Sequence, residues 1–178
     1  KALTGIKVID FSKWLPGQYC GMVLGDFGAM YKWKRLQADT RRFFPEALPG
    51  MTIGIWRLNR NKRGITADIK TEGGRKLLLR LLSEADVFLE GFRPGYLARY
   101  GLDYATVREI NPQLVYCSIT GFGQTGSYRH KPAHDLNVIG LAGLNSLDDV
   151  GSACVSEVQI AALGSSMNAV SGILLALL

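Results

Sequence analysis

Residues 114–137 read LVYCSITGFGQTGSYRHKPAHDLN, a strand-like apolar run that breaks into a glycine-rich loop and ends on a histidine and an aspartate. The run opens with strand-forming residues, and TGFG closes it with residues that tolerate tight turns and the close approach of a ligand. We therefore expect a strand that leads directly into a polar loop.

The loop offers groups suited to a polar ligand and a proton transfer. Histidine titrates near neutrality, and His134 stands directly beside the carboxylate of Asp135. Glycines leave backbone N–H groups unshielded, and polar side chains add further donors; these residues are Gly121, Gly123, Gln124, Gly126 and Tyr128. The alternative is a plain turn with a hydrogen-bonded histidine that has no catalytic role.

Strands and helices alternate on the N-terminal side of this stretch. Apolar runs predict strands at residues 5–12, 30–34, 64–69 and 86–92. Helical spacing and capping residues predict helices at residues 18–26, 72–85, 104–110 and, after the loop, 158–178. Residues 14–17 are predicted to be irregular, and residues 35–56 to form the longest loop. Residues 158–178 are long enough to span a membrane, but polar residues in their middle favour a buried helix.

This alternation predicts an α/β fold with a mainly parallel sheet and helices on both faces. Ligands in such folds lie beyond the carboxyl ends of the strands. Residues 14–18, 93–95 and 121–128 all follow predicted strands, so one cleft could collect all three. Gly17, Gly21 and Gly25 recur every four residues, unlike a dinucleotide fingerprint, and we interpret them as sites of close helix packing.

Composition narrows the class of ligand. The chain has 178 residues, 21 Lys and Arg against 15 Asp and Glu, and a net charge of +6. Much of the positive charge lies in residues 32–42 and 57–63, which indicates a polyanionic partner such as a phosphate-bearing small molecule. Nucleic acid is disfavoured because no recognition motif accompanies the charge. The three cysteines are far apart and form no metal or redox pair, which favours a reducing cytoplasmic compartment and no metal site.

Several ordered motifs resemble the N-terminal part of the family III CoA-transferase superfamily, which includes 2-methylacyl-CoA racemases. They are VIDFSKWLPGQYCGMVLGDFGA (8–29), NRNKRGITADIK (59–70), ADVFLEGFRPG (85–95), INPQLVYCSITGFGQTG (110–126) and HDLNVIGLAGL (134–144). The resemblance implies a Rossmann-like large domain built from both ends of a longer chain. Residues 1–178 would then be the N-terminal part of a CoA-binding large domain, with the rest of that domain and a small domain outside this chain. It also implies an interlocked homodimer. We expect no nucleic-acid or membrane partner, because recognition motifs are missing and polar residues lie within 158–178.

The resemblance further implies coenzyme A as the ligand, and a nucleotide with three phosphates agrees with the basic segments. Arg35 follows the second predicted strand and Arg93 belongs to the FRPG motif, so both are candidates for phosphate or adenine contacts. The other candidate CoA-binding residues are Arg60, Lys62 and Arg63 of the NRNKR segment, whose role is also compatible with structure alone, and Gly121, Gly123, Gln124 and Tyr128 of the loop.

The residues that do chemistry in this superfamily leave three hypotheses open. Racemases use a histidine in a His-Asp-Ile/Leu-Asn motif, which His134 and Asp135 match, so the resemblance implies α-proton abstraction from an acyl-CoA. Transferases and racemases both place an aspartate near the start of the last helix, yet residues 158–168 (VQIAALGSSMN) contain no carboxylate, and Glu157 lies too early. A CoA-transferase with its carboxylate elsewhere, or a non-catalytic CoA-binding or dimer-forming half, are the alternatives.

Overall fold

The computed structural model describes residues 1–34, 46–48, 51–52, 57–147, 149–152, 154 and 158–178. Its elements, in chain order, are β1 (Lys7–Asp10), α1 (Leu15–Asp26), β2 (Met30–Lys34), β3 (Glu46–Leu48), β4 (Met51–Thr52), β5 (Gly64–Thr66), α3 (Glu72–Leu82), β6 (Val87–Glu90), the 3-10 helix η2 (Leu97–Tyr100), α4 (Tyr104–Ile110), β7 (Val115–Ser118), α5 (Asp135–Leu141) and α6 (Ile160–Leu177).

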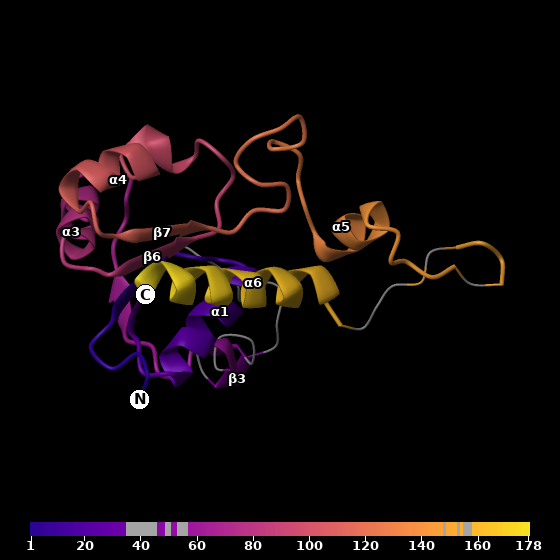
Figure 1. Ribbon diagram of the computed structural model, residues 1–178, viewed down its shortest axis with the longest axis horizontal. Coiled ribbons are helices and arrows are strands. Elements are labelled where there is room, and N and C mark those ends of the chain that lie inside the picture. Colours follow the sequence, from indigo (N-terminus) through magenta and orange to yellow (C-terminus); the bar gives the residue numbers. More distant parts are fainter. Residues whose placement is uncertain (35–45, 49–50, 53–56, 148, 153, 155–157) are drawn as a thin grey trace.

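Five strands form one sheet in the order β5-β2-β1-β6-β7, and every neighbouring pair is parallel. Helices α3 and α4 lie on one face of this sheet, and α1 and α6 lie on the other (Figure 1). The predicted α/β architecture is therefore confirmed. Because all five strands run the same way, their carboxyl ends meet at one edge of the sheet, where ligands bind in this class of fold.

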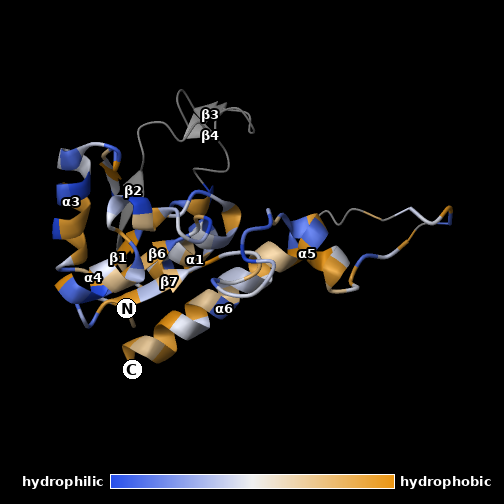
Figure 2. Cartoon of the chain, turned by 90° about the horizontal axis from the view of Figure 1, so that it is seen from above, coloured by the Kyte–Doolittle hydropathy of each residue, from blue (hydrophilic) through white to orange (hydrophobic). Residues whose placement is uncertain are grey.

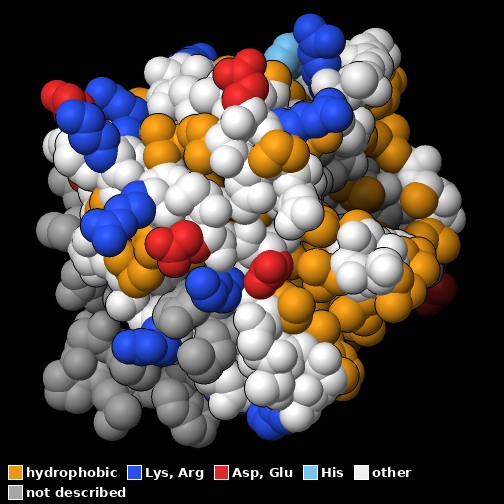
Figure 3. Space-filling view, turned by 60° about the vertical axis from the view of Figure 1, so that its left-hand side comes forward, with side chains coloured by type: hydrophobic (Ala, Val, Ile, Leu, Met, Phe, Trp, Pro, Cys, Tyr) orange, Lys and Arg blue, Asp and Glu red, His pale blue; other side chains and the backbone are white. Residues whose placement is uncertain are grey.

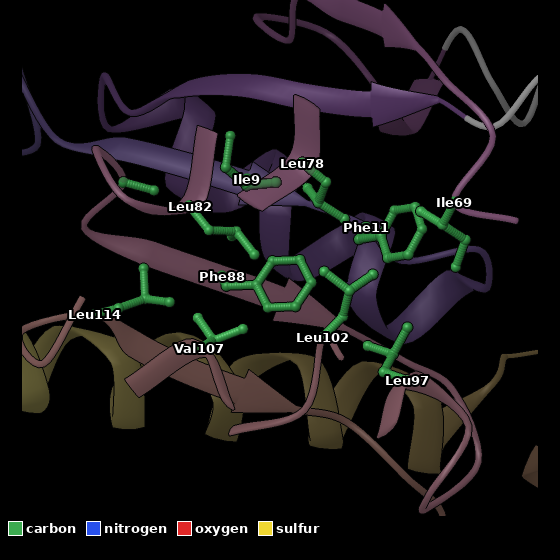
Figure 4. Packing of buried hydrophobic residues seen from close by; sticks show 11 residues of the cluster. Ile9, Phe11, Ile69, Leu78, Leu82, Phe88, Leu97, Leu102, Val107 and Leu114 are labelled. Carbon is green, nitrogen blue, oxygen red and sulfur yellow. The ribbon is translucent and has the colours of Figure 1, made fainter. Parts of the chain in front are cut away.

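The two faces of the sheet carry separate hydrophobic cores. Phe88 of β6 is fully buried among residues of α3 and α4, including Leu78 and Val107 (Figure 4). Its neighbours Val87 and Leu89 belong to the second core, together with residues of α1 and α6. This alternation follows from the two-residue period of a strand, and a continuous apolar run therefore marks a strand covered on both faces.

Helix α3 begins at the predicted capping residue, but one of its leucines lies outside the buried stripe predicted for it. The Thr71 side chain accepts a hydrogen bond from the Gly74 N–H and caps the helix, as expected. Leu78 and Leu82 are fully buried one turn apart, and hydrophobic and hydrophilic residues lie on different sides of the helix (Figure 2). Leu77, which was predicted to share the buried stripe, is 40% exposed because it points off that side.

Two predictions about irregular segments were wrong. Residues 14–17 were expected to be irregular, but α1 begins at Leu15 and takes Pro16 into its first turn. Proline is tolerated there because the first N–H groups of a helix have no partner inside the helix. Residues 35–56 were expected to be one loop, but they contain the antiparallel pair β3 and β4. Residues 35–45, 49–50 and 53–56 lie outside the described residues.

Glycines let α1 lie directly on the end of β1. A Cβ atom on Gly21 would lie 2.5 Å from Oδ2 of Asp10, and one on Gly17 would overlap the Ser12 side chain. The interpretation of these glycines as sites of close helix packing is confirmed for Gly17 and Gly21. Gly25 has ordinary contact distances, the nearest atom being the Asn61 Cβ at 3.6 Å from a built Cβ.

Helix α6 packs along α1 through one side only. Ala162, Ser166, Val170 and Ile173 are its buried residues, whereas Met167 and Leu175 are 47% and 71% exposed. The prediction of a buried helix is thus right for one face of α6. By length and composition alone this helix is also apolar enough to cross a membrane. Helix α5 and the segment that follows it project away from the sheet (Figure 1).

Candidate functional site

The carboxyl ends of β1, β6 and β7 are joined by contacts between the segments that follow them. The rings of Phe11, after β1, and Phe92, after β6, have centroids 5.2 Å apart. A Cβ atom on Gly121, after β7, would overlap the Ala133 side chain, so only glycine lets the loop fold back there. This loop therefore returns to the sheet just before His134. The ring contact joins the exits of β1 and β6, and a single cleft collecting residues 14–18, 93–95 and 121–128 stays a prediction.

His134 stands at the start of α5, in contact with the segment that leads from β1 into α1. Its backbone N–H donates to Oδ1 of Asn137 at 2.6 Å, and the Asn137 amide donates to the Pro132 carbonyl at 3.0 Å. The imidazole meets the ring of Trp14 edge-on, with centroids 6.3 Å apart and planes at 77°. Trp14 is half exposed and His134 is exposed, so a ligand can reach both.

Asp135 connects α5 to α6. Its Oδ1 accepts a hydrogen bond of 2.8 Å from the Ala162 N–H in the first turn of α6. The Ser166 hydroxyl donates to the Pro16 carbonyl at 2.8 Å and so joins α6 to the first turn of α1. The first turns of α1, α5 and α6 thus meet around His134. Asp135 was predicted to be catalytic, and this stays a prediction; in the structure one of its carboxylate oxygens is engaged with the backbone of α6.

The segment after β6 presents Arg93 to solvent. The Tyr96 N–H donates to the Arg93 carbonyl at 3.0 Å, and Gly95 has a φ of 79°, so Pro94 and Gly95 occupy the middle of a tight turn. The Phe92 and Tyr96 rings stack across this turn with centroids 4.9 Å apart. The Arg93 side chain is exposed on this rigid turn.

Glu90, the last residue of β6, is a buried carboxyl group at this edge. It is 4% exposed, its Oε2 accepts from the Phe92 N–H at 2.7 Å, and the Ser118 side chain donates to it from β7. Burial raises the pKa of Glu90, and the Ser118 and Phe92 bonds oppose that rise. No functional role was predicted for Glu90; the one sequence feature that could have drawn attention to it is an acidic residue at the end of an otherwise apolar strand.

The loop after β7 is exposed and carries aromatic and basic groups. Gly121, Gly123, Gln124 and Tyr128 are all exposed, and the Lys131 ammonium lies 3.8 Å from the centre of the Tyr128 ring. The Thr120 hydroxyl oxygen is buried, and among the described residues it has no hydrogen-bond partner. A buried polar atom without a partner is costly, so this hydroxyl is a candidate for contact with a ligand or water.

The Lys62 side chain of the NRNKR segment is engaged within the protein. Lys62 is buried, and its ammonium donates to Oδ2 of Asp10 at 2.8 Å, the Gln18 carbonyl at 2.8 Å and Oδ1 of Asn59 at 3.4 Å. These three acceptors occupy all three of its donors. Its CoA role stays an untested prediction, and the geometry accounts for Lys62 as a clamp between β1, α1 and residues 59–63.

The other predicted basic ligands are also spread out. The Arg60 guanidinium donates through two nitrogens to Asp26 at the end of α1, and these bonds lower the pKa of the Asp26 carboxyl. Arg63 is exposed and follows Lys62 into β5, while Arg35 lies outside the described residues. On the face seen in Figure 3, Lys and Arg side chains are scattered among acidic and hydrophobic ones. Among the predicted basic ligands within the described residues, Arg93 is the one in the segment that directly follows β6.

The structure contains hollows away from this edge. One of about 420 Å³ is lined by Tyr104, Arg108 and Pro112, and another of about 500 Å³ by Gly25, Gly28 and Arg63 among others. Neither of these two hollows is lined by His134, Arg93 or the loop after β7. Within the described residues, no group of three His, Cys, Asp or Glu side chains could hold a metal ion.

Comparison with known proteins identifies the family and agrees with the fold. The family model for CoA-transferase family III matches residues 3–178. The chain is 39% identical to the succinate–glutarate CoA-transferase of Agrobacterium fabrum over 99% of its own length and 47% of that protein. It is 37% identical to human α-methylacyl-CoA racemase, over 82% of the chain and 35% of that protein.

A crystal structure of a CaiB/BaiF family protein from Brucella suis superposes with a TM-score of 0.90 and 38% identity, covering 98% of this chain and 48% of that one. The chain thus spans about half the length, or less, of the relatives it matches. The match by family model extends over nearly every residue, and the fold is the same. The chain belongs to CoA-transferase family III.

Proposed function

We propose that the full-length protein binds an acyl-CoA at the carboxyl ends of β1, β6 and β7 and moves the proton on the carbon next to the thioester. The observation that carries the proposal is the position of His134, an exposed imidazole held where the first turns of α1, α5 and α6 meet. Family membership supports CoA thioester chemistry in general. The choice of proton transfer comes from the side chains present.

The proposed CoA contacts follow from charge and exposure. Arg93 offers a guanidinium on a rigid turn, and a phosphate oxygen can accept two of its N–H groups. Exposed glycines at 121 and 123 leave backbone N–H groups unshielded in the loop after β7, and the buried Thr120 hydroxyl has no partner among the described residues. Gln124 and Tyr128 would add polar and ring contacts from the same loop.

In the proposed reaction His134 acts as the base. A thioester acidifies the hydrogens on its α-carbon, so neutral imidazole can remove one; the electrons of the broken C–H bond pass into the carbonyl and form an enolate. Backbone N–H groups of the loop after β7 would hold the enolate oxygen. Return of the proton from the His134 imidazolium restores the thioester on the same face of the α-carbon, and inversion requires a second proton donor on the opposite face. Asp135 keeps α5 and α6 in register and takes no proton in this scheme.

Transfer of CoA between an acyl-CoA and a carboxylic acid is the second candidate. The Agrobacterium relative bears that name, and its identity to the chain is slightly higher than that of the racemase. Such a reaction carries the acyl group on a carboxylate, and the sequence of α6 has none. Trapping with hydroxylamine in the full-length protein, followed by mass spectrometry, tests for an acylated acid elsewhere. A non-catalytic CoA-binding half is the third candidate, and it predicts binding without either reaction.

Deuterium exchange tests the proposed proton transfer. A 2-methyl-branched acyl-CoA should exchange its α-hydrogen in deuterated water in the presence of the full-length protein. His134→Ala should slow this exchange by about 10² to 10⁴, the usual contribution of a positioned general base. His130 is the other histidine of the chain, lies exposed in the same loop and accepts a hydrogen bond from Arg129, so His130→Ala is the matched control and should exchange at the wild-type rate.

Exchange that survives His134→Ala would show that His134 is not the base, and absence of exchange in the wild type with a panel of acyl-CoA thioesters would discard the proton-transfer proposal. The interlocked homodimer and the cytoplasmic location stay predictions from the resemblance and from the cysteine pattern. Light scattering of the full-length protein tests the first of them.

A further inference from the structure

Glu90 is the buried titratable group of this edge that the proposed chemistry does not use. It is 4% exposed at the carboxyl end of β6, and its raised pKa reflects that burial. The other buried carboxylate of the edge, Asp10, is paired with the Lys62 ammonium. Glu90 instead bonds to the Phe92 N–H and to Ser118. Keeping a carboxyl group here costs free energy, so its contacts need an explanation.

Those contacts tie the exits of three strands together. The Glu90 side chain reaches Ser118 across the β6–β7 register, and its carbonyl accepts from the Ile119 N–H at 2.9 Å. Its Oε2 also fixes the Phe92 N–H at 2.7 Å. The Phe92 ring in turn packs on Phe11 after β1.

Arg93 directly follows the residue that Glu90 holds. Once the Phe92 N–H is bound, the direction in which the chain enters the 93–96 turn is set, and Gly95 and the Tyr96 N–H complete that turn. The backbone from which the Arg93 side chain projects is therefore held through Glu90. On the other side, the Ser118 bond fixes the residue that leads into Thr120 and Gly121.

Resting on the proposed acyl-CoA site, we propose that Glu90 is a positioning residue that sets the Arg93 turn and the loop after β7 at one fixed separation. It touches neither the ligand nor the reacting atoms. Its side chain shares the face of Phe88 and Tyr116, which α3 and α4 cover, whereas His134 meets Trp14 at the start of α1 on the other face. We therefore assign no proton transfer to it.

A double-mutant cycle in the full-length protein tests whether Glu90 acts through Arg93. Calorimetry with CoA should give a loss on the order of tenfold for Glu90→Ala, because the guanidinium bond depends on the turn it sits on. Glu90→Gln keeps an acceptor for Phe92 and a partner for Ser118, so it should bind CoA within about twofold of wild type. In the variant Glu90→Ala, Arg93→Ala the loss of affinity should be smaller than the sum of the two single losses, since part of the Glu90→Ala effect passes through Arg93.

Asp103→Ala is the matched control for lost stability. Asp103 is a partly buried carboxylate that caps α4 by accepting from the Thr106 N–H, and it bonds to neither strand exit. Its loss should lower the melting temperature while CoA affinity stays at the wild-type value. Amide hydrogen exchange without CoA adds a separate readout: residues 91–96 should exchange faster in Glu90→Ala and at the wild-type rate in Glu90→Gln.

The outcomes separate the two proposals. Wild-type protein that fails to bind CoA overturns the proposed function, and the exchange rates of residues 91–96 still decide whether Glu90 holds the turn. If the wild type binds CoA but the effects of Glu90→Ala and Arg93→Ala simply add, Glu90 does not act through Arg93. Glu90→Gln binding as weakly as Glu90→Ala would likewise overturn the inference.

Discussion

Two carboxylates at the same edge of the sheet, Asp10 and Glu90, are 1% and 4% exposed, yet their surroundings differ. Asp10 lies where the basic NRNKR segment packs on α1, and the Lys62 ammonium neutralises it. Glu90 lies where β6 and β7 end, and uncharged donors hold it. In the first region opposite charges satisfy one another inside the protein. In the second, the nearby cation Arg93 faces solvent.

A run of basic residues therefore does not by itself locate a ligand site. Lys62 and Arg60 are engaged with Asp10 and Asp26, and these pairs hold residues 59–63 against α1. A single arginine at a strand exit is a better candidate, because its charge is exposed on a tight turn. The following substitutions test this difference between the two regions.

The largest effect is expected at Lys62. Lys62→Met leaves the Asp10 carboxylate buried without its cation, and breaking a buried pair from one side costs about 3–5 kcal/mol. Urea unfolding should show this loss. Lys70→Met, at an exposed lysine, is the control and should stay within about 0.5 kcal/mol of wild type. Adding Asp10→Asn to Lys62→Met should recover part of the loss; unchanged stability in Lys62→Met would contradict the clamp.

Most elements of this fold could be predicted from the sequence because their signals, helix caps and apolar runs, are local. Thr71 and Asp103 cap the helices expected of them, and unbroken apolar runs such as 87–89 became strands buried on both faces. Contacts between distant residues were not predictable in the same way. The bond from Asp135 to Ala162 joins residues 27 apart, and the Lys62–Asp10 pair spans 52 residues. Such partners depend on how the helices pack on the sheet, so neither the Lys62–Asp10 pair nor the contacts of Glu90 were predicted.

A smaller and pH-dependent effect is expected at Glu90. Burial raises its pKa above the ordinary value of 4.5, so the fold favours the protonated form. Its stabilising contribution is complete below the unfolded-state pKa and is lost as the pH rises through the folded-state pKa. Glu90→Gln cannot ionise, so the variant should gain stability relative to wild type as the pH rises from about 4 to about 8. Urea midpoints across this range measure the gap, and parallel curves for the two proteins would contradict the shift.

Coenzyme A affinity of two arginine variants tests most directly where the ligand binds. In the full-length protein, Arg93→Ala should weaken CoA binding by about 1–3 kcal/mol, or roughly 5- to 150-fold in Kd, through loss of a charge-assisted bond to phosphate. Arg60→Ala should stay within about twofold of wild type, because the Arg60 guanidinium is bonded to Asp26 rather than to the strand exits. Isothermal titration calorimetry should therefore show a much larger loss of CoA affinity in Arg93→Ala than in Arg60→Ala. Weakened binding in Arg60→Ala with unchanged binding in Arg93→Ala would place the CoA phosphates on the NRNKR segment and contradict a site at Arg93.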